Sequence, residues 1–432
     1  MKFSEKFTNS LNIVAGKVSS NKYINTIKDA FILNLPLIFA GSFATLFSSV
    51  LCNPKSGLAK FPAFSFLADY ASLFSTINYG CLNLIAIYIC YFIASRLAKS
   101  NGVDESFTGI LAVASYIIVI PTSTSILVDN KPQIVNNVIA NTSTNSQGLF
   151  LAIIIGIITA EIFSKLMKSD KLLIKMPDSV PEGISKSFAS VVPTILTLLI
   201  ISLVSFVFIK ISGMNLSDAI FKTLQKPLEG VMQHPLGILI IVLVSQIFWF
   251  FGLHGANIVA AIKDPILLSA LATNMDLVAS GQDPTNIVAR PFWYLYCVFG
   301  GAGITIGLLL AIFIASKRED YRSVGKLAFI PALFNINEPV IFGLPIVLNP
   351  ILGIPFILTP LVTASIGYFA TYIGFAGIGS LDVPWTTPVF INSFLTTRGS
   401  IGAVITQLIC IVVSTLIYLP FVKAANKQID QK

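Results

Sequence analysis

The sequence predicts an all-α membrane protein that crosses the bilayer many times. Of its 432 residues, 55% are hydrophobic and only 11% are charged, and the mean hydropathy is +0.83. A soluble protein of this length needs a far more charged surface. Apolar windows of about 20 residues, enough to span a bilayer core of about 30 Å, recur along the chain. We therefore expect about ten transmembrane helices, two re-entrant hairpins and amphipathic helices on the membrane surface.

The charge pattern excludes several other classes of protein. The net charge of +8 fits a membrane protein that keeps Lys and Arg in cytoplasmic loops. These bases are not gathered on one face with aromatic residues between them, so we do not expect nucleic-acid binding. The five cysteines are scattered and are interpreted as small apolar residues. No phosphate-binding glycine loop, HExxH motif or acidic cluster occurs, so we expect no metal and no cofactor.

The amino-terminal half, residues 1–213, is expected to hold five spans. Residues 1–26 predict an amphipathic surface helix with Phe3, Phe7, Leu11 and Val14 on one face, and no cleaved signal. The spans are expected at 27–51, 73–97, 107–127, 148–167 and 191–211.

Loop charges orient these spans. Loop 128–147 has Lys131 as its single base and should lie outside, whereas the lysine-rich loop after the fourth span should lie inside. This orientation keeps the amino terminus in the cytoplasm. Glu161, near the end of the fourth span, is expected to pair with Lys165 four residues later.

Simple alternation fails in the carboxy-terminal half, residues 214–432. A polar helical segment, 216–230, precedes a sixth span at 235–253, and another clear span follows at 292–315. The later apolar stretches are 327–348, 351–375 and 401–422, before a basic tail. Three full crossings there would put the tail outside, against its charge. We therefore expect re-entrant hairpins near 254–275 and 331–350, with both termini cytoplasmic.

The stretch 331–350 contains one carboxylate, Glu338, in an otherwise uncharged apolar run. A carboxylate at membrane depth is costly and needs a partner or a function. Four prolines and a glycine make one uninterrupted helix improbable. Broken backbone inside a membrane is tolerated where protein or a water-filled cavity satisfies it. The sequence thus predicts a polar site near mid-membrane that Glu338 faces.

The two histidines differ in context. His254 lies between Gly252 and Gly255 at the end of an apolar run, where it could exchange a proton with a ligand. The alternative is a helix-end histidine that bonds to a backbone carbonyl. His234, in QHP beside polar residues, is interpreted as a solvated loop histidine.

Amide and aromatic side chains near these groups are candidate ligand contacts. Amides can donate to and accept from hydroxyl groups, and indole rings offer flat apolar faces. For Trp249, a membrane-interface aromatic is an equally good interpretation. Arg290 and Arg398, single bases at span edges, are interpreted as topological anchors. The predicted substrate-binding residues are Asn257, Asn335, Asn337, Trp249 and Trp385.

Four motifs in order give a specific resemblance. They are KMPDSVPEGISKSFASVVP (175–193), FWFFGLHGAN (248–257), FNINEPVIFGLPIVLNPILGIPFILTP (334–360) and VPWTTP (383–388). Together they resemble enzyme IIC, the membrane component of the lactose/cellobiose family of the bacterial phosphoenolpyruvate-dependent sugar phosphotransferase system. The resemblance covers nearly the whole chain.

This resemblance implies a disaccharide permease of the bacterial cytoplasmic membrane whose substrate is phosphorylated on a C6 hydroxyl. It implies a homodimer held by the amino-terminal spans, with the sugar held by the carboxy-terminal spans and hairpins. His254 and Glu338 match the family's pair of site residues and would be the catalytic pair. The phosphoryl donor would be a phosphocysteine of a IIB subunit, fed by a IIA subunit, both expected as separate polypeptides.

An ion-coupled secondary transporter is the main alternative, since it too places broken helices and a buried acid at mid-membrane. It would deliver the sugar without phosphorylation. A membrane transferase without transport has less support, because no donor site is visible. The motifs leave open whether the sugar is cellobiose, lactose or diacetylchitobiose, and whether His254 or Glu338 accepts the proton.

Overall fold

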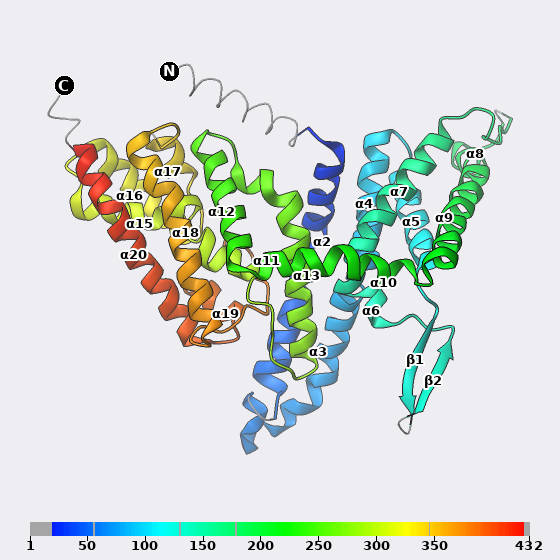
Figure 1. Cartoon of the computed structure of the whole chain (residues 1–432), viewed down its shortest axis with the longest axis horizontal. Helices are drawn as coiled ribbons and strands as arrows, with labels where there is room; N and C mark the ends of the chain where they lie inside the picture. Colours follow the sequence, from blue (N-terminus) through cyan, green and yellow to red (C-terminus); the bar gives the residue numbers. More distant parts are fainter. Residues whose placement is uncertain (1–19, 55–56, 129–130, 178, 345, 427–432) are drawn as a thin grey trace. The chain divides into compact units, whose positions relative to one another are not determined.

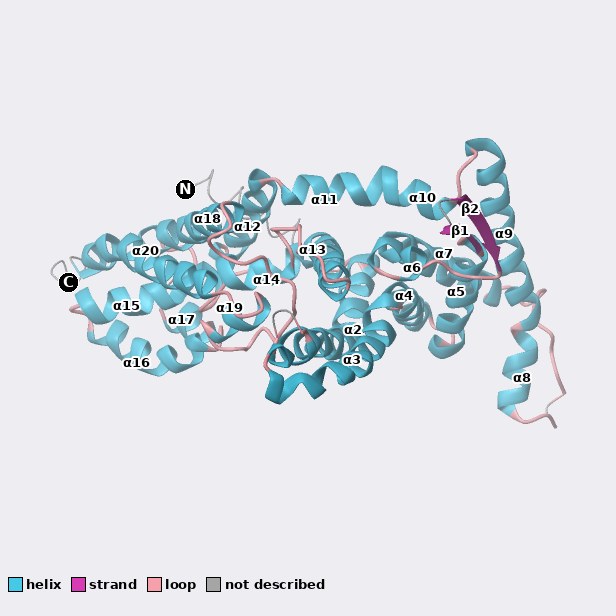
Figure 2. Ribbon diagram, turned by 90° about the horizontal axis from the view of Figure 1, so that it is seen from below, coloured by secondary structure: helices cyan, strands magenta, loops and turns pink. Residues whose placement is uncertain are grey.

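The computed structural model describes residues 20–54, 57–128, 131–177, 179–344 and 346–426. Most of the surface helix expected at 1–26 and the end of the basic tail lie outside these residues. Helices make up nearly all the regular structure (Figure 1). Figure 2 shows one pair of strands beside them, β1 and β2, which run antiparallel with Ser123 opposite Asn136.

The first half of the chain forms a series of helices interrupted by this β-hairpin. Its elements are α2 (Lys22–Phe47), η1 (Ser48–Cys52), η2 (Leu58–Lys60), η3 (Pro62–Tyr70), α3 (Ala71–Asn78), η4 (Tyr79–Asn83), α4 (Ile85–Asn101), α5 (Glu105–Val119), β1 (Ser123–Val128), β2 (Lys131–Asn136), α6 (Asn141–Thr144), η5 (Ser146–Gly148), α7 (Leu149–Met167), α8 (Glu182–Ala189) and α9 (Val191–Ser212).

The second half is helical throughout its regular structure. Its elements are α10 (Leu216–Ile220), η6 (Phe221–Gln225), α11 (Lys226–Gln233), α12 (Pro235–Phe250), α13 (Gly255–Ala279), α14 (Arg290–Phe292), η7 (Trp293–Cys297), η8 (Ala302–Ile304), α15 (Thr305–Ala315), α16 (Glu319–Leu333), α17 (Glu338–Gly343), α18 (Pro350–Tyr372), α19 (Ile391–Thr396) and α20 (Ile401–Asn426).

Seven helical segments of the described chain are long and apolar enough to cross a membrane. An eighth is obtained if the helical segment Leu216–Gln233 and α12, which meet at a bend of 82°, are counted as one span. This bend falls at His234, whose Nδ1 accepts from the Leu236 backbone N–H and caps α12. The multi-spanning helical class is confirmed, while the expected count of ten spans stays a prediction.

Two local expectations were wrong. The third span, expected at 107–127, leaves the helix after Val119, because Pro121 follows and the chain then enters β1. Glu161 does not use Lys165 as its partner. Its carboxylate instead accepts from Lys22 Nζ at 2.6 Å and from Asn101 Nδ2 at 3.3 Å. Lys22 is far from Glu161 in the sequence, and helix packing brings it close to the carboxylate.

The chain divides into two compact units. One comprises Ser20–Ile38 and Tyr79–Leu228, and its core lies where α4, α5 and α7 pack together. Small residues allow this close packing: a Cβ on Gly156 would lie 3.0 Å from the Cys90 carbonyl oxygen of α4. Tyr116 Oη donates to the Ser143 carbonyl at 2.5 Å and ties the segment before α7 to this core.

The other unit contains Phe39–Asn78 and Glu229–Lys432. Here α15 packs against α16 and α20, and α18 packs against α12 and α20. Buried apolar side chains of α15, α16, α17, α18 and α20 form one continuous cluster. Both hairpins expected in the carboxy-terminal half belong to this unit. The expected division at residue 213 stays a prediction.

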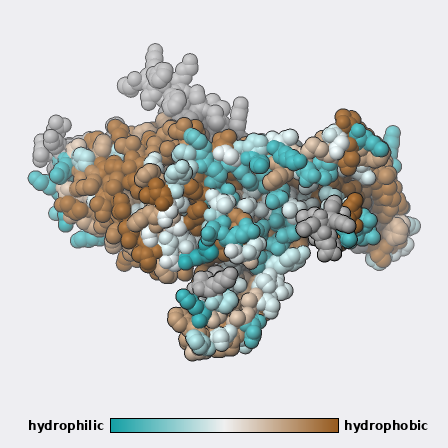
Figure 3. All heavy atoms as spheres, turned by 60° about the horizontal axis from the view of Figure 1, so that its bottom comes forward, coloured by the Kyte–Doolittle hydropathy of each residue, from teal (hydrophilic) through white to brown (hydrophobic). Residues whose placement is uncertain are grey.

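The outward faces of the long helices are apolar, as a membrane requires. On α20 an exposed stripe recurs every three or four residues, opposite the buried face. Figure 3 shows hydrophobic residues gathered over broad areas of the visible surface. The stripe of α20 consists of Ile401, Ile405, Leu408, Val412 and Leu416.

The crossing of α15 and α20 gives a stability prediction. A Cβ on Gly307 would overlap the Ser414 side chain and lie 2.9 Å from its backbone carbonyl carbon. Close helix crossings in membranes depend on such small residues. Gly307→Ala should therefore destabilise the protein by about 1–3 kcal/mol, measured as a lower thermal midpoint in detergent. The same change at Gly230 in α11, whose Cβ would meet no atom within 4 Å, should not lower it. Equal midpoints for the two variants would contradict this account.

Candidate functional site

The span expected at 292–315 lies within a helical segment, Arg290–Ala315, that is long and apolar enough to cross a membrane, but the helix is interrupted inside it. Helix η7 ends at Cys297 and α15 begins at Thr305, with the turn 298–301 and the short helix η8 between them. Gly300, Gly301 and Gly303 all have positive φ angles of 64° to 97°, which only glycine adopts without strain. The GGAG sequence at 300–303 was the available signal for this break.

Side chains from other segments satisfy the broken backbone. Asn335 Oδ1 accepts from the Gly300 N–H at 2.8 Å, and Asn337 Nδ2 donates to the Ala302 carbonyl at 2.9 Å. Tyr418 Oη of α20 donates to the Gly303 carbonyl at 2.7 Å. The break is therefore held by the hairpin that carries Glu338, as buried backbone groups require.

The turn between α12 and α13 presents His254. Gly252 has φ +79°, and a Cβ on Gly255 would collide with the Ser245 carbonyl, so the chain folds back tightly on α12. His254 is the N-cap of α13, and its Nδ1 accepts from the Asn257 backbone N–H at 3.3 Å. Its ring lies 4.3 Å from the Trp249 ring, centroid to centroid, and the residue is exposed.

The segment 331–350 presents Glu338. Helix α16 ends at Leu333, the short helix α17 starts at Glu338, and α18 starts at Pro350, so the expected interruption of the helix is confirmed. Glu338 is exposed. The Leu348 N–H donates to the Phe250 carbonyl at 2.9 Å, which joins this segment to the turn that carries His254.

The predicted acid and histidine lie on joined segments of one unit. The Glu338 carboxylate lies within electrostatic range of the His254 ring. Both side chains are exposed on one unit, on segments joined by a backbone hydrogen bond. Such an arrangement can exchange a proton with, and hold, a hydroxyl group placed between them.

The other predicted binding residues fall into two groups. Trp385 is 46% exposed and Asn257 is also exposed, so both can contact a ligand. Trp249 is only 7% exposed and packs against His254, so the interpretation of it as a membrane-interface aromatic was wrong. The amides of Asn335 and Asn337 are engaged with protein backbone, including bonds from Asn335 Nδ2 to the Trp385 and Thr387 carbonyls.

One buried ion pair beside this site was missed. Arg290 Nη1 lies 2.6 Å from Asp382 Oδ2, with side chains 9% and 2% exposed, so the interpretation of Arg290 as a topological anchor was wrong. The available signal was Asp382 itself, a charge three residues before Trp385 in a mostly apolar segment.

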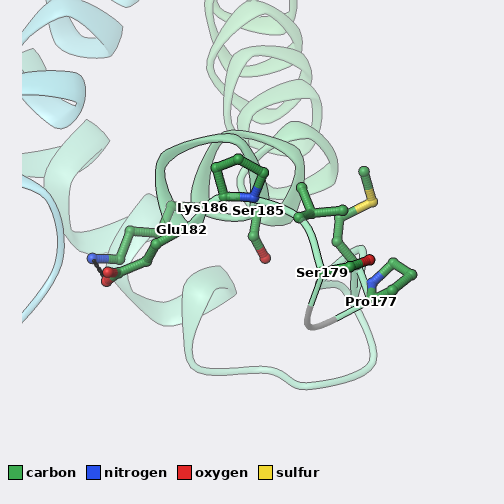
Figure 4. A pocket seen from close by; sticks show the side chains of 8 residues that line it. Pro177, Ser179, Glu182, Ser185 and Lys186 are labelled. Atoms are coloured by element: carbon green, nitrogen blue, oxygen red, sulfur yellow. Dashed lines mark ion pairs between the residues drawn. The ribbon is translucent and has the colours of Figure 1, made fainter.

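The motif at 175–193 forms a separate pocket on the unit that contains α8. The pocket has a volume of about 530 Å³ and is lined by one short stretch of chain, between Met176 and Lys186. Figure 4 shows Glu182 and Lys186 paired at its edge, 2.5 Å apart. A second cavity, of about 330 Å³, lies between η1, α3 and the end of α13 and contains neither His254 nor Glu338.

Comparisons with known proteins agree on one family. A family model described as "Phosphotransferase system, EIIC" matches residues 28–360. The chain is 32% identical to the "PTS system oligo-beta-mannoside-specific EIIC component" of Bacillus subtilis (strain 168), over 98% of this chain and 94% of that protein. It is 32% identical to the "PTS system cellobiose-specific EIIC component" of Lactococcus lactis subsp. lactis (strain IL1403), over 96% of each.

A solved structure gives the same result at the level of the fold. The crystal structure of the transporter ChbC, the IIC component of an N,N'-diacetylchitobiose-specific phosphotransferase system, superposes with a TM-score of 0.90 at 32% identity. The match covers 96% of both chains. This multi-pass membrane protein therefore belongs to the EIIC family of the phosphotransferase system, the sugar permease components of a transferase complex.

Proposed function

We propose that this permease moves a β-linked disaccharide across the bacterial cytoplasmic membrane and presents its C6 hydroxyl to a phosphocysteine on a separate IIB subunit, which a IIA subunit rephosphorylates. The observation that carries the proposal is that exposed His254 and Glu338 stand on two segments of one unit that the Leu348–Phe250 backbone hydrogen bond joins. Relatives named for cellobiose and N,N'-diacetylchitobiose support the choice of substrate class.

His254 acts as a hydrogen-bond donor in this proposal. Its Nδ1 accepts the Asn257 backbone N–H, so in the neutral ring the proton is on Nε2. Nε2–H then points a donor at the ligand, either at the C6 oxygen or at a phosphoryl oxygen. The cap that starts α13 thus also selects the tautomer of the imidazole.

Glu338 acts as the proton acceptor. Its carboxylate takes the proton from the C6 hydroxyl as the oxygen attacks phosphorus, the P–O bond forms and the P–S bond of the phosphocysteine breaks. The cysteine leaves as a thiolate. Alignment and charge stabilisation supply most of the rate in phosphoryl transfer, and the joined hairpins provide that alignment.

The remaining site residues bind or position the sugar. Trp385 offers an exposed ring for stacking on a sugar face, and the Asn257 amide can bond a sugar hydroxyl. Trp249 supports the His254 ring from behind. The predicted sugar contacts of Asn335 and Asn337 are proposed to be secondary to their bonds with the broken backbone.

The same proposal assigns a different role to each half of the chain. The carboxy-terminal half, residues 214–432, would hold the sugar, and the hairpins and their supporting segments all fall within one compact unit. The amino-terminal half, residues 1–213, would form the contact of a homodimer. Both termini would lie in the cytoplasm, as the loop charges predict.

The Glu338→Gln variant tests the chemistry directly. We expect sugar binding within about threefold of wild type, because an amide still bonds the hydroxyl, and phosphorylation by the IIB donor lowered by about 10²–10⁴-fold. Binding is measured by titration and phosphorylation by transfer to labelled sugar. Glu319→Gln, an exposed glutamate at the start of α16, is the matched control and should behave as wild type. Full phosphorylation by Glu338→Gln would remove the carboxylate from the mechanism.

Proteoliposomes separate this proposal from an ion-coupled transporter. With a proton gradient and no phosphoryl donor, we expect no concentrative uptake, because the energy comes from the donor. Accumulation of unmodified sugar under these conditions would favour the ion-coupled alternative.

The Asn335→Asp variant tests the positioning role of this amide. Aspartate keeps the acceptor for the Gly300 N–H but places an oxygen where Nδ2 now donates to the carbonyls of Trp385 and Thr387. We expect a loss of about 1–3 kcal/mol of stability as well as weaker sugar binding. If Asn335 served only the sugar, affinity would fall while the thermal midpoint stayed at its wild-type value.

A further inference from the structure

The segment 377–390, between α18 and α19, carries Trp385 but has little regular structure of its own. Its shape depends on bonds to other elements. The Gly379 carbonyl accepts from Asn274 Nδ2 of α13 at 3.0 Å, and the Asp382 N–H donates to Ser42 Oγ of α2 at 3.1 Å. The Val389 N–H donates to the Leu333 carbonyl at 2.9 Å.

The Arg290–Asp382 pair is the charged member of this set. Arg290 begins α14, and its guanidinium also lies 5.6 Å from the Tyr294 ring centroid. Gly379 packs against the neighbouring Pro291, where a Cβ would lie 2.7 Å from the proline Cβ. The segment therefore contacts α14 at two adjacent points, one apolar and one charged.

Further charges surround the pair. Asp264 of α13 acts electrostatically on both Arg290 and Asp382. Its neighbour Lys263 pairs with it and lies 4.8 Å from the Trp293 ring centroid. Two bases and two acids from three separate elements thus form a neutral cluster, beside the segment that carries Trp385.

A buried ion pair is a poor source of net stability, because removing two charges from water costs about as much as their attraction returns. What such a pair does provide is a fixed relative orientation of the two segments that carry it, because a guanidinium and a carboxylate bond in few geometries. The function proposed above assigns no role to Arg290 or Asp382. Both side chains are buried, so they offer little surface to a sugar.

We propose that Arg290 and Asp382 are positioning residues, which fix the 377–390 segment so that Trp385 faces the sugar. This proposal rests on the function proposed above for the site. Asp382 stands three residues before Trp385, and Asn335 holds the carbonyl of Trp385 itself from the hairpin that carries Glu338. The ion pair thus fixes the chain just before Trp385 to α14. The Asn335 amide fixes the Trp385 carbonyl to the segment that carries Glu338.

The decisive variant replaces the pair by apolar side chains of similar size, Arg290→Met with Asp382→Leu. Such replacements of buried ion pairs commonly preserve folding. We expect a thermal midpoint close to wild type, a sugar Kd raised at least about tenfold, and a kcat at saturating sugar within about threefold of wild type. Asp382→Asn alone should weaken sugar binding as well and should also lower the midpoint, because it leaves Arg290 buried and unpaired.

Iodide quenching of tryptophan fluorescence reports the position of Trp385. Of the three tryptophans, Trp249 and Trp293 are 7% and 2% exposed, whereas Trp385 is 46% exposed. Quenching should therefore come mainly from Trp385, with Trp385→Phe as the baseline. The Arg290→Met/Asp382→Leu variant should be quenched to a different extent from wild type. Asp320→Asn, which removes the pair between partly buried Arg318 and exposed Asp320 in the same unit, should change neither quenching nor affinity.

Wild-type affinity and wild-type quenching in the apolar double variant would overturn the proposal. Failure of that variant to fold would also overturn it, because the pair would then be required for the fold and not for positioning. Failure of the proposed site is separable. In that case Trp385→Phe would bind sugar normally, while quenching in the double variant would still report whether the segment had moved.

Discussion

A backbone N–H or carbonyl that leaves a helix inside a membrane has no water to bond, so another part of the protein must bond it. This constraint decides the structure around residues 298–304, in the unit that carries the proposed site. The glycines there break a helix that hydropathy alone predicts to be continuous, and amides from the Glu338 hairpin bond the exposed backbone. The segment that carries Glu338 therefore also bonds the interrupted backbone of this helix.

Sequence reasoning predicted the multi-spanning helical class and singled out His254 and Glu338 because both leave local signals. Apolar windows mark the helices, and a lone carboxylate or histidine among apolar residues, glycines and prolines marks a site. It missed partners that are distant along the chain. Arg290 and Asp382 are 92 positions apart, and Lys22 and Glu161 are 139 apart. No local pattern records such a pairing, so Arg290 was misread as a membrane anchor.

The two asparagines show a different limit. They were predicted to bind the substrate, since amides can both donate to and accept from hydroxyl groups, and the structure shows them bonded to backbone. The same groups bond a sugar hydroxyl or a peptide group equally well, and residue type does not decide between them. The decisive fact was the backbone break, which hydropathy does not register because glycine and alanine count as apolar or neutral. Interpreted as a break in the helix, the GGAG sequence would have predicted a free backbone N–H and a free carbonyl at this point. These are the groups that Asn335 and Asn337 bond.

The hydrogen bond from the Leu348 N–H to the Phe250 carbonyl links the segment that carries His254 to the segment that carries Glu338 through main chain alone. Any replacement other than proline keeps both bonding groups, so this link does not depend on which side chains stand at the two positions. If His254 and Glu338 act together as proposed, a bound sugar would meet two groups whose segments are already joined through main chain. In that case the protein would not need to assemble its reacting groups at one stage of transport, and the arrival of the phosphoryl donor would set the timing of the reaction.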